Sequence, residues 1–235
     1  MRKSGLASVL LALLLLSALF VYVKGRERTL LGERLEYQIE GGGFFLLEVS
    51  PQETLYRGVK CYNVRFEFSA RGLQRSGSYL MDEKGGLRFL QVQVAENAGG
   101  TEVRVTGGLD VWAGLNKVHT SWISSTEGVV HENFFDLPPN LSTPEHFLML
   151  VRFRNLKSGY YEEFSFLQLP IPTEAPVNAQ VIGSETVRTP AGEFKCQVLQ
   201  LGGGWNARLW VSESGVVARF QEDNLQYNLK SRVVG

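Results

Sequence analysis

The chain has 235 residues, and its 24 Lys and Arg against 24 Asp and Glu give a formal net charge of zero. A neutral chain lacks the basic surplus that neutralises phosphates, so a nucleic-acid partner is not expected. The roughly 210 residues that follow the first two dozen are enough for one domain with a sizeable core.

The chain starts with an export signal. Arg2 and Lys3 precede an uncharged run, residues 4–23, in which leucine dominates. A basic start and an apolar core are typical of a secretory signal, but the run is long enough to span a bilayer and lacks an A-x-A cleavage site. We therefore interpret residues 1–25 as a signal anchor or signal peptide, with the uncleaved anchor favoured, and residues 26–235 as a single exported β domain. The expected location is the cell envelope: anchored in the cytoplasmic membrane with the domain facing the periplasm or exterior, or secreted if the segment is cleaved.

Short alternating apolar runs predict strands through most of the domain. The predicted strands cover residues 33–40, 44–49, 60–69, 76–81, 87–95, 101–106, 109–113, 117–124, 129–135 and 162–169, with more strands over 177–234. The four glycine clusters at 41–43, 99–100, 107–108 and 202–204 are predicted to be turns between strands, and the proline-rich residues 170–176 a link.

One helix interrupts the strands. Ser142-Thr143-Pro144-Glu145 has the pattern of a capping box with proline in the first turn. The apolar residues that follow at helical spacing predict a helix from about Pro144 to Arg154 that packs on the sheet.

Two stretches resemble each other. Residues 57–64 around Cys61 and 191–199 around Cys196 are each followed by a strand and an acidic-glycine turn. Either a four-strand unit is duplicated or two β hairpins look alike by chance. The predicted fold is therefore mainly β, an antiparallel curved sheet or half-barrel, with or without a pseudo-duplication, together with one short helix around 144–154 and an N-terminal transmembrane or signal helix.

Cys61 and Cys196 are the two cysteines of the chain. In an oxidising compartment they could form a disulfide that closes a long loop. The alternative is two buried thiols that act as small apolar side chains.

The sequence offers little for catalysis. It has no H-E-x-x-H or G-x-S-x-G pattern, so we expect no catalytic, cofactor-binding or metal-binding residues, no cofactor, and no enzyme activity. An enzyme with an unrecognised site is the least favoured alternative. It would require His119, His131, Glu132 and Asp136 to converge in a cleft.

Aromatic side chains are the candidates for a binding site. A barrel-like sheet often encloses a ligand cavity, although an ordinary β core would use the same residues. The candidate lining residues are Phe66, Phe68, Trp112, Trp122 and Trp210. The favoured function is a non-enzymatic binding module for an apolar, lipid-like ligand or an envelope partner protein. The alternative is a structural or assembly module of the envelope without a small-molecule site.

Four segments together carry a family resemblance. They are the opening Gly32-Glu33-Arg34-Leu35-Glu36-Tyr37, the 144–154 helix with Gly159 after it, residues 187–196, and Leu209-Trp210-Val211-Ser212 with Gly215. In order and spacing the chain resembles the bacterial exported family known as domain of unknown function 3108. That resemblance implies a mostly antiparallel β domain in the envelope with no established activity. It supplies no catalytic residues.

Overall fold

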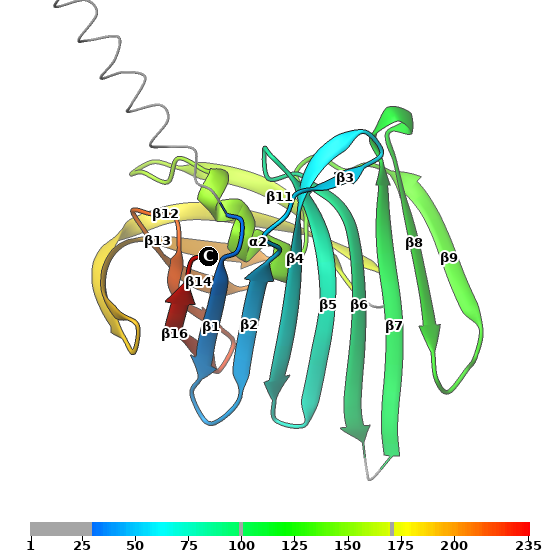
Figure 1. The fold of residues 1–235 in the computed structure, drawn as a ribbon, viewed down its shortest axis with the longest axis horizontal. Helices are drawn as coiled ribbons and strands as arrows, with labels where there is room; N and C mark the ends of the chain where they lie inside the picture. The colour runs from blue at the N-terminus through cyan, green and yellow to red at the C-terminus, as the bar shows by residue number, and fades with distance from the viewer. Residues whose placement is uncertain (1–29, 99–100, 170–171) are drawn as a thin grey trace, which may run out of the picture. The chain divides into compact units, whose positions relative to one another are not determined.

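Sixteen strands of the described residues form one continuous sheet, which curls around the α-helix α2 (Figure 1). The computed structural model describes residues 30–98, 101–169 and 172–235. Residues 31–235 make up one compact unit. The signal or anchor predicted over 1–25, the glycine turn at 99–100 and the start of the 170–176 link lie outside the described residues. In the part that is described, no helix is long and apolar enough to cross a membrane.

The sheet is an antiparallel meander except at one edge. The neighbour order is β10-β11-β12-β13-β14-β15-β16-β1-β2-β4-β5-β6-β7-β8-β9, and the short β3 pairs with β4. The first group of strands is β1 (Arg34–Ile39), β2 (Phe44–Val49), β3 (Thr54–Tyr56), β4 (Val59–Ala70), β5 (Leu73–Asp82), β6 (Leu87–Ala98), β7 (Thr101–Trp112), β8 (Lys117–Ser124) and β9 (Val130–Asp136). The second group is β10 (Leu141–Ser142), β11 (Tyr161–Gln168), β12 (Thr173–Thr189), β13 (Gly192–Gly203), β14 (Ala207–Ser212), β15 (Val217–Glu222) and β16 (Leu225–Val233). The mainly-β, curved-sheet prediction is therefore confirmed.

Three predicted boundaries are wrong. Gly107 and Gly108 are not a turn, because they lie inside the twelve-residue β7. Gly202 and Gly203 end β13 instead of separating strands. Pro176 is part of β12, opposite Ser165 of β11, so the proline-rich link gives way to strand by Thr173.

The helix is shorter than predicted and is capped differently. α2 runs from Pro144 to Leu150 and continues as the 3-10 helix η2 (Val151–Phe153). The N-cap is Thr143, whose hydroxyl accepts a bond from the His146 amide at 3.3 Å. The predicted capping box is not formed, because the Ser142 hydroxyl contacts the His146 ring and the Glu145 carboxylate pairs with Arg75.

The sheet has an inner face, which α2 covers, and an outer face. Tyr79 of β5 marks the inner face, because its hydroxyl donates to the Glu145 carbonyl of α2 and its ring meets His146 edge-on at 5.5 Å. Cross-strand partners share a face, so the row Tyr79, Leu90, Leu109, Thr120 and Asn133 is inner. The neighbouring row, from Leu80 through Phe89 to Phe134, is outer.

The two halves of the sheet repeat a local structure. In the turn after β5, the Asp82 amide bonds the Gly86 carbonyl, and the Asp82 carboxylate accepts from the Gly86 amide. In the turn after β14, Ser212 makes the same two bonds to Val216. Both hairpins also have a β-bulge at the same place, on the strand that follows the turn. The two hairpins are therefore alike in local structure as well as in sequence.

The two cysteines occupy equivalent places in these units. Cys61 pairs in register with Asp82 and Cys196 with Ser212. Both are buried free thiols, so the disulfide considered from the sequence is not formed in this structure. Cys196 belongs to a small outer-face core with Val187, Val198, Trp210 and Ala218. Burial raises the pKa of the Cys196 thiol to about 11, as expected of a packing residue.

Candidate binding surface

The outer face of β6 to β9 carries a row of aromatic and titratable side chains. Register places Phe89, Asp110, His119 and Phe134 opposite one another on four consecutive strands. The rings of His119 and Phe134 stack at 4.4 Å, and Trp112 meets Phe134 edge-on at 5.8 Å. These rings lie on the face of the sheet that is turned towards solvent. A cluster of aromatic rings is unusual on such a face.

Asp110 fixes one end of this surface. Its carboxylate accepts hydrogen bonds from the Tyr56 hydroxyl at 2.7 Å and the Trp112 indole at 2.7 Å, and it pairs with the Arg57 guanidinium. Tyr56 and Arg57 come from the β3–β4 hairpin, which therefore bends over the outer face towards β7 (Figure 1). Burial, and then the hydrogen bond to Asp110, raises the pKa of Tyr56. With three donors around it, this carboxylate serves to hold the hairpin in place.

Next to Asp110 and the β3–β4 hairpin lies an apolar groove of about 460 Å³. Its lining residues are Phe89, Gln91, Thr106, Gly107, Gly108, Leu109, Asp110, His119, Ser121, Trp122, Ile123 and Val130. Gly108 lies at the bottom of the groove and adds no side chain to fill it. A Cβ there would lie 3.3 Å from the Leu90 carbonyl oxygen. Ile123 is 37 % exposed, and Val130 and Phe134 are each 59 % exposed.

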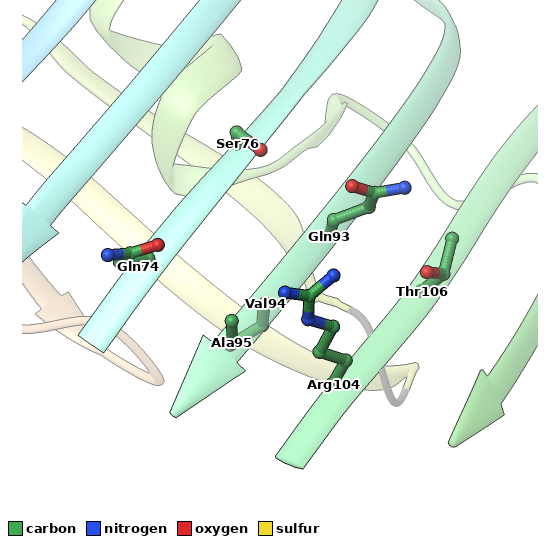
Figure 2. A pocket seen from close by; sticks show the side chains of 7 residues that line it. All are labelled: Gln74, Ser76, Gln93, Val94, Ala95, Arg104 and Thr106. Atoms are coloured by element: carbon green, nitrogen blue, oxygen red, sulfur yellow. The ribbon is translucent and has the colours of Figure 1, made fainter. Parts of the chain in front are cut away.

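A polar hollow continues the groove along the same face. It has a volume of about 420 Å³ and shares Thr106 with the groove. Figure 2 shows Gln74, Ser76, Gln93 and Arg104 rising from β5, β6 and β7 around it. The outer face thus offers an apolar section beside a section rich in amide and hydroxyl groups.

The five aromatic residues predicted to line a cavity do not come together. Phe66 is buried in the inner core beside Tyr79, and Phe68 lies on the same face near Tyr227. Trp112 is on the outer face, whereas Trp122 is on the inner face, where its ring stacks on His131 at 4.0 Å. Trp210 is buried in the outer cluster of the other half, and its indole donates to Glu185 at 2.8 Å. The single cavity inferred from sequence is therefore not assembled.

The residues required for the enzyme hypothesis also diverge. His119 and Glu132 lie on the outer face 3.6 Å apart, whereas His131 is on the inner face and contacts Glu127 at 3.1 Å. Asp136 pairs with Lys117 at 2.6 Å. These four groups therefore form no common cleft. Within the described ranges, no three His, Cys, Asp or Glu residues are placed to hold a metal ion.

The buried polar groups around α2 are paired structurally. Glu33 contacts both Arg152 and Arg232, and Arg75 contacts Glu145 at 2.8 Å. These pairs join α2 and η2 to strands of both halves, so they fix the helix in the curl of the sheet.

Sequence reasoning missed the groove, although β9 contained a signal for it. The outer positions of β9 carry Val130 and Phe134 together with Glu132 and Asp136, whereas the inner positions carry His131, Asn133 and Phe135. Two apolar side chains on the outer positions of an edge strand indicate a surface for contact, but the face of each residue depends on the register.

No protein-family model matches the chain, and no curated protein matches it. Among solved structures, the chain is similar to a β-barrel-like protein of domain of unknown function 1849 from Brucella abortus, with a TM-score of 0.55 and 10 % identity over 86 % of this chain and 97 % of the other. It also matches a DUF1089 protein from Pseudomonas aeruginosa, with a TM-score of 0.38 and 14 % identity over 74 % of this chain and 89 % of the other. A Bacteroides fragilis protein of YmcC-like fold matches at a TM-score of 0.33 and 10 % identity, over 86 % and 96 % of the two chains.

The first of these similarities shows the fold and no more. The β-barrel-like fold occurs in a bacterial protein whose family has no assigned function. This agrees with the unknown-function class implied by the sequence resemblance, whereas membership of domain of unknown function 3108 itself is not shown.

Proposed function

We propose that the protein is a non-enzymatic binding module of the cell envelope that holds a partner protein against the outer face of β6 to β9. The envelope location and the attachment to the membrane are proposed because residues 1–25 are predicted to be an export signal or anchor. Binding a partner protein involves no chemical step, so the proposed module needs no cofactor.

The observation that carries this proposal is the apolar groove. A groove lined by Phe89, Ile123 and Val130 keeps apolar surface in contact with water, at a cost of about 25 cal/mol per Å² relative to a covered state. Apolar grooves with polar rims are typical of protein interfaces. The adjacent polar hollow with Gln74, Gln93 and Arg104 supplies such a rim.

The geometry favours a protein over a lipid-like ligand. Lipid carriers enclose the apolar chain inside the barrel. Here α2 covers the inner face, and Phe147, Phe164, Phe166 and Trp205 pack there at ring distances of 5.0 to 6.4 Å. The apolar groove lies instead on the outside, where a flat partner surface can reach it.

The test is site-specific photo-crosslinking in intact cells that produce the full chain. A benzophenone side chain at Phe134 should give one recurring protein adduct. The same group at Tyr161, which is equally exposed at 58 % but lies on β11, should give none. Adding Ile123→Asp should abolish the adduct at Phe134, because a carboxylate placed in the groove opposes apolar contact.

Three results would contradict the proposal. Equal adducts at both positions would mean non-specific contact, and an adduct of lipid mass at Phe134 would favour the apolar-ligand alternative. Loss of the adduct with Ile182→Asp, an exposed apolar residue of β12, would show that any added charge has the same effect.

A further inference from the structure

The strand β9 is an edge of the sheet with one free side. It has seven residues and pairs with β8 alone among the described strands. Figure 1 shows it as the last strand of the front layer. Alternate residues of an antiparallel edge strand direct their N–H and C=O groups away from the neighbouring strand. β9 therefore offers backbone donors and acceptors for another strand.

Proteins normally block such edges. Common devices are charged side chains, especially lysine, or proline on the edge, a β-bulge, or a very short strand, and of these β9 has the carboxylates of Glu132 and Asp136. β9 has no lysine and no proline, and its register with β8 runs without a bulge from Lys117↔Asp136 to Ile123↔Val130. The opposite edge, β10, has only two residues. The two edges thus differ, because β9 is long enough for another strand to pair along it and β10 is not.

Space lies beside the free edge. On the side towards β11 and β12, a hollow of about 270 Å³ separates Asn133, Phe134 and Phe135 from Leu167 and Glu174. The apolar groove lies on the outer side of the same strand. A strand added to β9 would therefore meet room on one face and the apolar groove on the other.

The charges around β9 indicate the kind of strand that fits. Residues 117–136 contain three acidic side chains, Glu127, Glu132 and Asp136, against the single Lys117. The side chains of Glu132 and Asp136 are 58 % and 81 % exposed. Along the outer face of β9, Val130 and Phe134 alternate with these two carboxylates.

We propose that β9 binds an extended segment of the partner protein as an added strand, and that this segment alternates apolar and basic side chains on one face. This inference rests on the proposed function and names the partner's chemistry. Apolar residues opposite Val130 and Phe134 extend the groove contact, and basic residues opposite Glu132 and Asp136 neutralise the acidic edge. Pairing of β9 with β9 of a second copy is disfavoured, because it would bring two acidic strands together.

The test measures binding of labelled peptides to the full chain, kept in mild detergent, by fluorescence anisotropy. The probe has seven residues, with Lys, Val, Lys and Val at odd positions and Thr at even positions. We expect saturable binding that weakens about tenfold when both lysines become glutamate, as two cross-strand charge pairs would give. N-methylation of alternate backbone amides should also abolish binding, because it removes the strand's donors.

Matched protein variants locate the site. Glu132→Lys should weaken binding about threefold, because it reverses one of the two charge pairs, whereas Glu67→Lys, the same change at an exposed position of the central strand β4, should leave binding unchanged. Equal binding of the N-methylated peptide would overturn the inference, and so would the absence of saturable binding to the folded chain. Dimerisation of the chain that Glu132→Lys abolishes would also overturn it, in favour of a second copy. If groove crosslinking succeeds while these peptide results fail, the proposed function stands and the added strand does not.

Discussion

At the scale of single residues, His146 of α2 shows how buried polar groups on the inner face of the sheet find hydrogen-bond partners. Its Nε2 lies 2.9 Å from the Gly85 carbonyl oxygen, which can only accept, so Nε2 carries the proton. Its Nδ1 lies 2.9 Å from the Ser142 hydroxyl, which donates to it. Both ring nitrogens are thus satisfied in the neutral form, and burial lowers the pKa of His146 to about 4.

This neutral histidine makes the stability of the fold depend on pH. Because the pKa is lower in the folded state than the ordinary value of 6.5, the unfolded chain binds the proton more readily, and the free energy of unfolding falls as pH drops through 6.5 towards 4. We expect the wild type to lose about 2 kcal/mol more between pH 7 and pH 5 than His146→Gln, measured by urea unfolding. Parallel pH dependence in the two proteins would show that His146 is not held neutral.

Residue identity alone did not reveal the groove. Phe134 and Val130 look like core residues in the sequence, and the cysteines look like a disulfide pair as readily as two packed thiols. Only the register shows that Val130 and Phe134 share the outer face with Glu132 and that Cys61 and Cys196 are separate. Register is set by pairing between distant strands, so a single sequence does not fix it.

At the scale of elements, alternation predicted β2 and β8 to the residue and most other strands to within a few positions. The errors came from local rules that tertiary structure overrides. Gly107 and Gly108 satisfy a turn rule, yet β7 continues through them because β6 and β8 pair with both. β3 and β10 were missed because runs of three and two residues carry no detectable periodicity.

Gly77 shows why a glycine stands inside a long strand. In β5, a Cβ at this position would lie 2.1 Å from the Gln91 carbonyl oxygen and 2.8 Å from Cζ of Phe66, whose ring lies across the strand. We expect Gly77→Ala to lower the free energy of unfolding by about 2 kcal/mol, because the crowded backbone must shift.

The control for this prediction is Gly183→Ala in β12. Nothing lies within 4 Å of a Cβ there, so the expected change is within about 0.5 kcal/mol. Equal urea midpoints for the two variants would contradict the packing explanation for Gly77.

At the scale of the whole molecule, one sheet runs through both halves of the described unit. Each half is a meander that continues along the same sheet, and β16 of the second half pairs with β1 of the first. The long hairpin of β12 and β13 folds back so that Ala191 bonds the Leu229 carbonyl and Val187 covers Trp210. The second half is thus covered on its outer face, whereas the outer face of the first half ends in the groove and the free β9.

The proposed interface depends on this asymmetry, because it lies where the outer face of the sheet is uncovered. Hydrogen–deuterium exchange on the full chain tests it most directly. We predict that the outward amides of β9 exchange faster than those of β4 to β6, and that the alternating Lys and Val peptide slows them selectively. Slow exchange along β9 in the free chain would contradict it, because another part of the chain would then already pair with the edge.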